Sequence, residues 1–153
     1  MKKYHIQLAF LCLLATALSF TACKEDEIDL LDPIPQIINV SVNPTTVVEF
    51  EDEITFSVEY RDGDGDLGEN DPNVTNLFVI DNRVGITESF RVSQLAPDNA
   101  NVPITGTLQV ILPSTGITDN STSQTVNYTI YMVDRAGNES NRFTTGDITV
   151  NGG

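Results

Sequence analysis

The feature that most limits the fold of this chain is a repeated two-residue alternation of apolar and polar side chains. It is clearest over residues 53–60, where Ile54, Phe56, Val58 and Tyr60 alternate with polar residues. Side chains on a β-strand point to opposite faces in turn, so this pattern predicts a strand with one buried face. Similar segments, separated by turn-forming residues, predict further strands at 37–43, 74–81, 86–94, 104–112, 125–133 and 143–150.

Short strands at this spacing, with no segment of helical period after residue 23, predict an all-β domain over residues 36–153. The expected architecture is an immunoglobulin-like antiparallel β-sandwich of about seven strands, and a small barrel is the alternative. Within 104–112, Ile111 interrupts the alternation and predicts burial of that strand on both faces. The sandwich topology would bring the loops that follow 53–60, 86–94 and 125–133 to one end of the domain.

The N-terminal segment, residues 1–22, has the composition of a secretory signal peptide. Lys2 and Lys3 precede an apolar stretch from Ile6 to Leu18, which is shorter than the roughly 20 residues a transmembrane helix needs. Thr21 and Ala22, followed by Cys23, resemble the lipobox of bacterial lipoproteins. That resemblance implies that Cys23 becomes the new N-terminus and carries diacylglycerol and palmitate, which would anchor the protein to a membrane. An ordinary signal peptide with an incidental cysteine is the alternative.

The residues after the cysteine extend this resemblance. Lys24, Glu25, Asp26 and Glu27 are similar to the export signal of Bacteroidetes-type surface lipoproteins. The similarity implies a lipid-anchored protein of the outer membrane that faces the cell exterior. Residues 23–35 are acidic and then interrupted by prolines, which is typical of a tether between an anchor and a folded domain.

Composition excludes several kinds of chemistry. The only histidine, His5, and one of the two cysteines, Cys12, would leave with the signal peptide. The remaining 131 residues then lack the groups needed for Ser-His-Asp or Cys-His catalysis and for histidine- or cysteine-ligated zinc. Loss of Lys2 and Lys3 would also take the net charge from −14 to −16, which disfavours a nucleic-acid partner. Chemistry that needs only carboxylates is not excluded by composition.

One loop stands out as a candidate cation site. Residues 61–71 contain five carboxylates, Asp62, Asp64, Asp66, Glu69 and Asp71, interspersed with Gly63, Gly65 and Gly68. Carboxylates this close repel one another, and Ca²⁺ would remove the repulsion because it accepts six to eight oxygen ligands from a flexible loop. In the sandwich, Asp134 and Asn138 would lie close enough to contribute oxygens, with Asp98 and Asn99 also within reach.

The loop is not an EF-hand, although Asp62, Asp64 and Asp66 have the right spacing. Leu67 stands at the sixth position, where an EF-hand needs glycine, and Asn73 stands at the twelfth, where it needs glutamate. A looser calcium site, with a Kd on the order of 10⁻⁴ to 10⁻³ M, remains one interpretation. A solvated turn built from aspartate and glycine, both good turn formers, is the other.

Two segments resemble known immunoglobulin-like modules. Phe56–Leu67 is similar to a strand and following acidic loop of PKD-like and cadherin-like domains, and Tyr128–Ser140 is similar to their last hairpin. The resemblance implies a β-sandwich but not a particular activity. Three functions therefore stay open: a non-enzymatic surface module that binds a protein or glycan, a structural accessory lipoprotein of an outer-membrane complex, and a carboxylate-dependent hydrolase.

Overall fold

The computed structural model describes residues 32–153, so the signal peptide, Cys23 and the segment Lys24–Glu27 lie outside the described residues. The ten strands are β1 (Gln36–Asn43), β2 (Thr46–Val48), β3 (Ile54–Asp62), β4 (Leu77–Asp81), β5 (Thr87–Phe90), β6 (Ile104–Leu112), β7 (Ser123–Val126), β8 (Tyr128–Met132), β9 (Phe143–Thr144) and β10 (Ile148–Asn151). Within this part of the chain no helix has the length and apolar character needed to cross a membrane.

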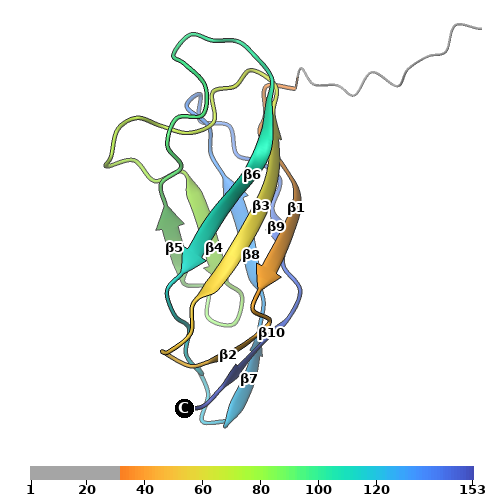
Figure 1. The fold of residues 1–153 in the computed structure, drawn as a ribbon, viewed down its shortest axis with the longest axis vertical. Helices are drawn as coiled ribbons and strands as arrows, with labels where there is room; N and C mark the ends of the chain where they lie inside the picture. The colour runs from red at the N-terminus through yellow and green to blue at the C-terminus, as the bar shows by residue number, and fades with distance from the viewer. Residues whose placement is uncertain (1–31) are drawn as a thin grey trace, which may run out of the picture.

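Two antiparallel sheets face each other and form the body of the domain (Figure 1). One sheet has the strand order β1-β3-β6, and the other has the order β5-β4-β8-β9. The two sheets remain separate throughout residues 32–153, so the predicted immunoglobulin-like sandwich is confirmed and the barrel alternative is wrong.

A third, smaller sheet continues the sandwich at the end that carries the C-terminus (Figure 1). It has the order β2-β10-β7, with β2 parallel and β7 antiparallel to β10. The predicted strands 125–133 and 143–150 are therefore each divided in two, because one part pairs in this sheet and the other in the four-stranded sheet. Strand β2 was not predicted, since three residues are too few for an alternation to show.

The predicted strand 86–94 is shorter than expected. Strand β5 ends at Phe90, which pairs with Leu77 of β4, and residues 91–103 then cross to the other sheet, where β6 begins. The crossing segment runs over the end of the sandwich that also holds the acidic loop (Figure 1). Its local sequence gave no sign of this change of sheet, because pairing partners are set by contacts distant in sequence.

The core lies between the facing sheets and follows the predicted alternation. The Phe56 and Tyr128 rings meet edge to face with centroids 5.3 Å apart, which links β3 to β8 across the interior. The fully buried side chains are Val47, Ile54, Phe56, Val58, Leu67, Leu77, Val79, Val126, Ile130, Met132, Ile148 and Val150. Most of them stand at alternate positions of β3, β4, β8 and β10, as a half-buried strand requires.

Two isoleucines on the edge strands β1 and β6 are about half exposed. A β-bulge between Ile37 and Asn39 shifts the register of β1, so Ile37 is buried and Ile38 is 47% exposed. Ile111 is 48% exposed, so the prediction that β6 is buried on both faces is wrong. Its neighbours Val110 and Leu112 point into the core, which leaves Ile111 on the outer face of a two-layer sandwich.

We predict that Ile130→Ala lowers the free energy of unfolding by about 2–5 kcal/mol, because it leaves a cavity in the core. The chemically matched variant Ile111→Ala should change it by less than about 0.5 kcal/mol, since that side chain is half exposed on an edge strand. Urea unfolding followed by circular dichroism at pH 7 measures both. Equal effects of the two variants would contradict the assignment of the two faces.

Candidate metal centre

Strand β3 leads directly into the acidic loop and places its first carboxylate in the interior. The strand runs two residues beyond the predicted end, and its last residue, Asp62, is only 1% exposed. Asp62 Oδ2 accepts a hydrogen bond from the Leu67 backbone N–H at 2.8 Å. Leu67 is itself fully buried, so the turn between these residues is fixed at both ends.

Asp62, Asp64 and Asp66 converge on one point, and together they form what we call the aspartate cluster. One carboxylate oxygen from each lies within 4.8 Å of the others. The Oδ1 atoms of all three are buried and have no hydrogen-bond partner within residues 32–153. Buried carboxylate oxygens without a partner are rare, because removing them from water is costly unless something replaces the lost hydrogen bonds.

Glycines make this convergence possible. Gly65 has a φ of 77°, and a Cβ there would lie 2.3 Å from the Val102 carbonyl oxygen. Gly68 has a φ of 88°, and a Cβ there would meet the Ser93 carbonyl oxygen at the same distance. A side chain at either position would be strained and would separate the loop from the segment 91–103.

A fourth carboxylate lies near the cluster. Asp134 is 7% exposed, and its charge raises the pKa values of both Asp62 and Asp66. The Asp134 oxygens accept hydrogen bonds from the backbone N–H and side-chain amide of Asn138, at 2.7 and 2.9 Å. The predicted meeting of the acidic loop with the last hairpin therefore occurs, and Asn138 holds Asp134 in place there.

Backbone N–H groups of the last hairpin also donate hydrogen bonds to the acidic loop. The Ala136 N–H donates to Asp66 Oδ2 at 3.0 Å, and the Arg135 N–H donates to the Asp66 carbonyl oxygen at 3.3 Å. The Arg135 side chain donates to the Gly68 carbonyl oxygen at 2.9 Å and makes no ion pair with a carboxylate of residues 32–153. The Arg135 charge lowers the pKa of Asp66, but burial and the neighbouring acids raise it by more.

The tether meets the domain at this same end. The Gly63 N–H donates to the carbonyl oxygen of Asp32 at 3.0 Å. A Cβ at Gly63 would lie 2.2 Å from that oxygen, so only glycine allows the contact. Because this contact is between backbone atoms, the identity of Asp32 gave no sign of it; the only sequence signal was the glycine.

The other predicted ligands have different roles in this structure. Glu69 Oε1 accepts hydrogen bonds from the backbone N–H groups of Asn70 and Asp71, at 2.7 and 3.2 Å. Asp71 Oδ1 accepts from the backbone and side-chain nitrogens of Asn73, at 2.8 and 2.9 Å. Both carboxylates thus stabilise their own turn and lie outside the aspartate cluster.

The segment 91–103 likewise contributes backbone rather than side chains. The Val102 N–H donates to the Asp64 carbonyl oxygen at 3.2 Å. The Asp98 carboxylate accepts a hydrogen bond from Gln94 at 2.8 Å, and Asn99 is exposed with a φ of 61°. These two residues are therefore not part of the cluster as it stands in this structure.

The electrostatics of the cluster oppose full ionisation. Burial, with smaller contributions from the charges of Asp64, Asp66 and Asp134, raises the pKa of Asp62 to about 6. Burial and the charges of Asp134 and Asp64 also raise the pKa of Asp66. Metal-free protein at neutral pH therefore holds several mutually repelling negative charges in a partly buried site.

We predict that the contribution of Asp62 to the stability of metal-free protein falls as the pH rises from about 4 to above 6. The raised pKa means that the folded state binds the proton more tightly than the unfolded state. This stabilisation is complete below the unfolded pKa and is lost above the folded one. Asp62→Asn should remove this contribution and raise the Tm in EDTA at pH 7.5, because the amide is neutral and its oxygen still accepts from Leu67.

Thermal unfolding in EDTA between pH 4 and pH 8, followed by circular dichroism, measures this effect. Glu59→Gln, an exposed acid on β3, is the control and should keep the pH profile of the wild type. An Asp62→Asn profile parallel to that of the wild type would contradict the assignment of the raised pKa to Asp62.

Comparison with known proteins adds little. No family model matches the chain, and no curated protein matches it. Among solved structures, the chain is similar to a Niemann-Pick type C2 protein from the Japanese carpenter ant, with 8% identity and a TM-score of 0.38. The match covers 78% of this chain and 93% of that one, and at this level of similarity it gives no information on function.

Proposed function

We propose that the aspartate cluster binds Ca²⁺. The observation that carries this proposal is the set of three buried Oδ1 atoms, one from each aspartate, that converge without a hydrogen-bond partner. A hard divalent cation would supply the missing partner for all three oxygens at once. It would also offset both the burial and the mutual repulsion that raise the pKa of Asp62.

Other oxygens close to the cluster can complete the coordination. The Asp134 carboxylate is buried beside it, and each of its oxygens accepts only one hydrogen bond in this structure. The Asn138 side-chain amide is held by the same contacts, and its Oδ1 accepts no hydrogen bond from residues 32–153. With water, Asp62, Asp64, Asp66, Asp134 and Asn138 offer the mixture of carboxylate and amide oxygens that Ca²⁺ favours over Mg²⁺.

The bound cation would be structural rather than catalytic. It would join β3, the segment 91–103 and the last hairpin, which already exchange hydrogen bonds through Asp64 and Asp66. Because Asp32 is bonded to Gly63 in the same loop, the cation would also fix the point where the tether enters the domain. A rigid exit point would hold the domain at a defined orientation to its anchor.

For the whole protein, we propose a non-enzymatic binding module held at the outer face of the outer membrane by lipid on Cys23. Two sequence features support this proposal: the lipobox-like residues before Cys23 and the acidic segment Lys24–Glu27. The fold supports it as well, because Asp32, the first described residue, contacts the loop at one end of the sandwich. The end that holds the aspartate cluster would face the anchor, and the opposite end would face outward. A protein or glycan ligand on the outer side fits this orientation.

We predict that Ca²⁺ raises the thermal stability of the chain from residue 24 onward. For a Kd near 10⁻⁴ M, about 1 mM Ca²⁺ should add roughly 1.4 kcal/mol, which corresponds to a rise in Tm of several degrees. Asp64→Asn should remove most of the rise, because it takes one negative charge from the three converging carboxylates that would hold the cation. Differential scanning calorimetry in EDTA, Ca²⁺ and Mg²⁺ measures the shift.

Asp71→Asn is the matched control, since Asp71 belongs to the same loop but lies outside the cluster, and it should keep the full Ca²⁺ response. An equal rise with Mg²⁺ would contradict a calcium-selective site. If about 10 mM Ca²⁺ leaves the Tm unchanged, the loop is an acidic turn and the calcium site is contradicted.

We predict that Cys23→Ala releases the protein from the membrane fraction, because the acylation site is lost. Replacing Lys24–Glu27 by alanine should leave the protein in the membrane fraction but protect it from protease added to intact cells. Cell fractionation followed by immunoblotting with and without protease distinguishes the two. Wild-type protein that resists added protease in intact cells yet is degraded in lysed cells would contradict surface exposure.

A further inference from the structure

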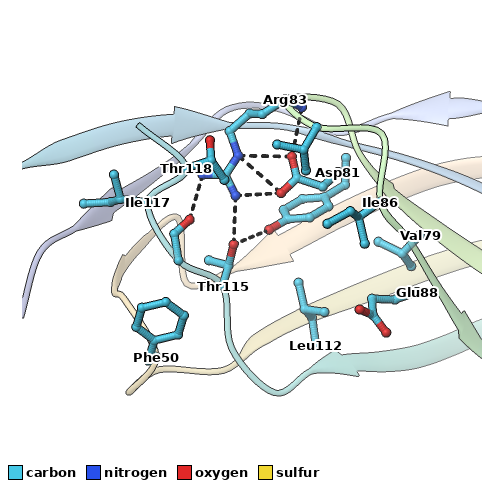
Figure 2. A pocket seen from close by; sticks show the side chains of 13 residues that line it. Phe50, Val79, Asp81, Arg83, Ile86, Glu88, Leu112, Thr115, Ile117 and Thr118 are labelled. Carbon is cyan, nitrogen blue, oxygen red and sulfur yellow. Dashed lines mark hydrogen bonds and ion pairs between the residues drawn. The ribbon is translucent and has the colours of Figure 1, made fainter. Parts of the chain in front are cut away.

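A second candidate site lies away from the aspartate cluster, on the part of the sandwich toward the opposite end. It is a pocket of about 380 Å³ between the turn after β4, strand β5 and the segment that follows β6 (Figure 2). Strand β4 begins near the cluster and ends here at Asp81, so the two sites are separated by the length of that strand. The pocket volume falls in the range of small-molecule sites.

The pocket has an apolar floor and an apolar rim. Val79, Leu112 and Tyr128 form a buried floor, and the Tyr128 hydroxyl is satisfied by Thr115 Oγ1 at 3.0 Å. Phe50 and Ile86 line the same pocket but are 72% and 60% exposed. Large apolar side chains gathered around an apolar concavity are typical of a surface that binds a ligand.

Phe50 is held at the rim by a strained backbone. Its φ is 59°, which is unusual for an aromatic residue, and its N–H donates to the Thr115 carbonyl oxygen at 3.0 Å. The ring lies against Gly116, where a Cβ would come within 2.4 Å of the ring's Cζ. Only glycine at 116 allows the ring this position. Strain of this kind tends to be kept where a side chain has a role.

The positive charge beside the pocket is not available to a ligand. Arg83 Nε donates to both Asp81 oxygens, and Nη2 donates to Asp81 Oδ2 and Thr115 Oγ1. The remaining donor, Nη1, bonds to the Gly116 carbonyl oxygen and to Gln124 Oε1 (Figure 2 shows the bonds to Asp81 and Thr115). All five N–H groups are thus used, and the Asp81 charge is neutralised.

The charge that remains at the pocket is the carboxylate of Glu88. It lines the pocket and makes no hydrogen bond or ion pair within the described residues. In Figure 2, Leu112 is drawn between Glu88 and Phe50, so the apolar floor separates the free carboxylate from the exposed ring. The surroundings add to the negative potential, because residues 32–153 contain 18 acidic side chains against five arginines and no lysine.

We propose that this pocket binds a small organic ammonium ion with an aromatic or branched aliphatic body. The body packs on Leu112 and Ile86 against the Phe50 ring, and the ammonium group pairs with the Glu88 carboxylate. The proposal depends neither on calcium in the aspartate cluster nor on the lipid anchor, since none of those residues lines the pocket.

Tryptamine is a suitable probe, and the chain has no tryptophan, so the fluorescence of the ligand's indole can be followed directly. Fluorescence anisotropy is measured with the chain from residue 24 onward at physiological ionic strength. Indole-3-propionate has the same ring and linker but the opposite charge. We expect saturable binding of tryptamine that is at least about tenfold tighter than binding of the propionate.

Two variants test the geometry. Glu88→Gln should weaken tryptamine binding about tenfold and remove the preference over the propionate. Phe50→Asn should weaken binding of both compounds without lowering the Tm, because asparagine tolerates a positive φ. Glu59→Gln, which removes an exposed charge outside the pocket, should change nothing.

The proposal is overturned by any of three results. The first is equal binding of the two compounds, and the second is no saturable signal up to about 10 mM tryptamine. The third is loss of affinity in Glu59→Gln as large as in Glu88→Gln, which would show attraction to the overall negative charge instead of a site.

Discussion

The convergence of three aspartates at the end of β3, each with one buried carboxylate oxygen, is the constraint on which one end of this structure depends. One carboxylate oxygen from each of Asp62, Asp64 and Asp66 lies within 4.8 Å of the others, and the Oδ1 of each has no partner within residues 32–153. In the absence of a cation, this arrangement costs free energy through lost hydration and mutual repulsion. The end of the domain tolerates it because buried Leu67, three glycines and hydrogen bonds from neighbouring segments fix the loop.

The same contacts explain why the cluster end is continuous with the tether. Gly63 bonds to Asp32, Asp64 to Val102, and Asp66 to Arg135 and Ala136, so segments far apart in sequence meet around one loop. The proposed cation would act on all of them together. Its effect on stability is therefore expected to be larger than its few ligands suggest, because loops that otherwise open separately would become one unit.

The pocket near Phe50 contrasts with the cluster in how its charges are arranged. Arg83 forms an ion pair with Asp81 and donates hydrogen bonds to Thr115 and Gly116. These contacts connect the turn after β4 to the segment after β6. Apolar surface is left for a ligand, together with the Glu88 carboxylate, which has no partner in the part of the chain that the structure describes. If the tether end faces the membrane, this pocket is on the side from which a ligand would approach.

Most of the strands and the candidate loop could be predicted from the sequence. Period-two alternation located β3 to within two residues and β6 at its observed bounds, because alternation depends only on which face of a strand is buried. The crowding of acids and glycines in residues 61–71 was equally visible in the sequence. Local chemistry is sufficient to predict features of this kind.

How these segments meet depends on contacts between residues that are distant in sequence. The bulge in β1, the short strand β2 and the pairing of β5 with β4 depend on partners distant in sequence. Contacts likewise separated the cluster aspartates from Glu69 and Asp71, which bond to their own turn. The Phe50 pocket was invisible in the sequence for the same reason, since its lining comes from four separate segments whose proximity no local pattern encodes.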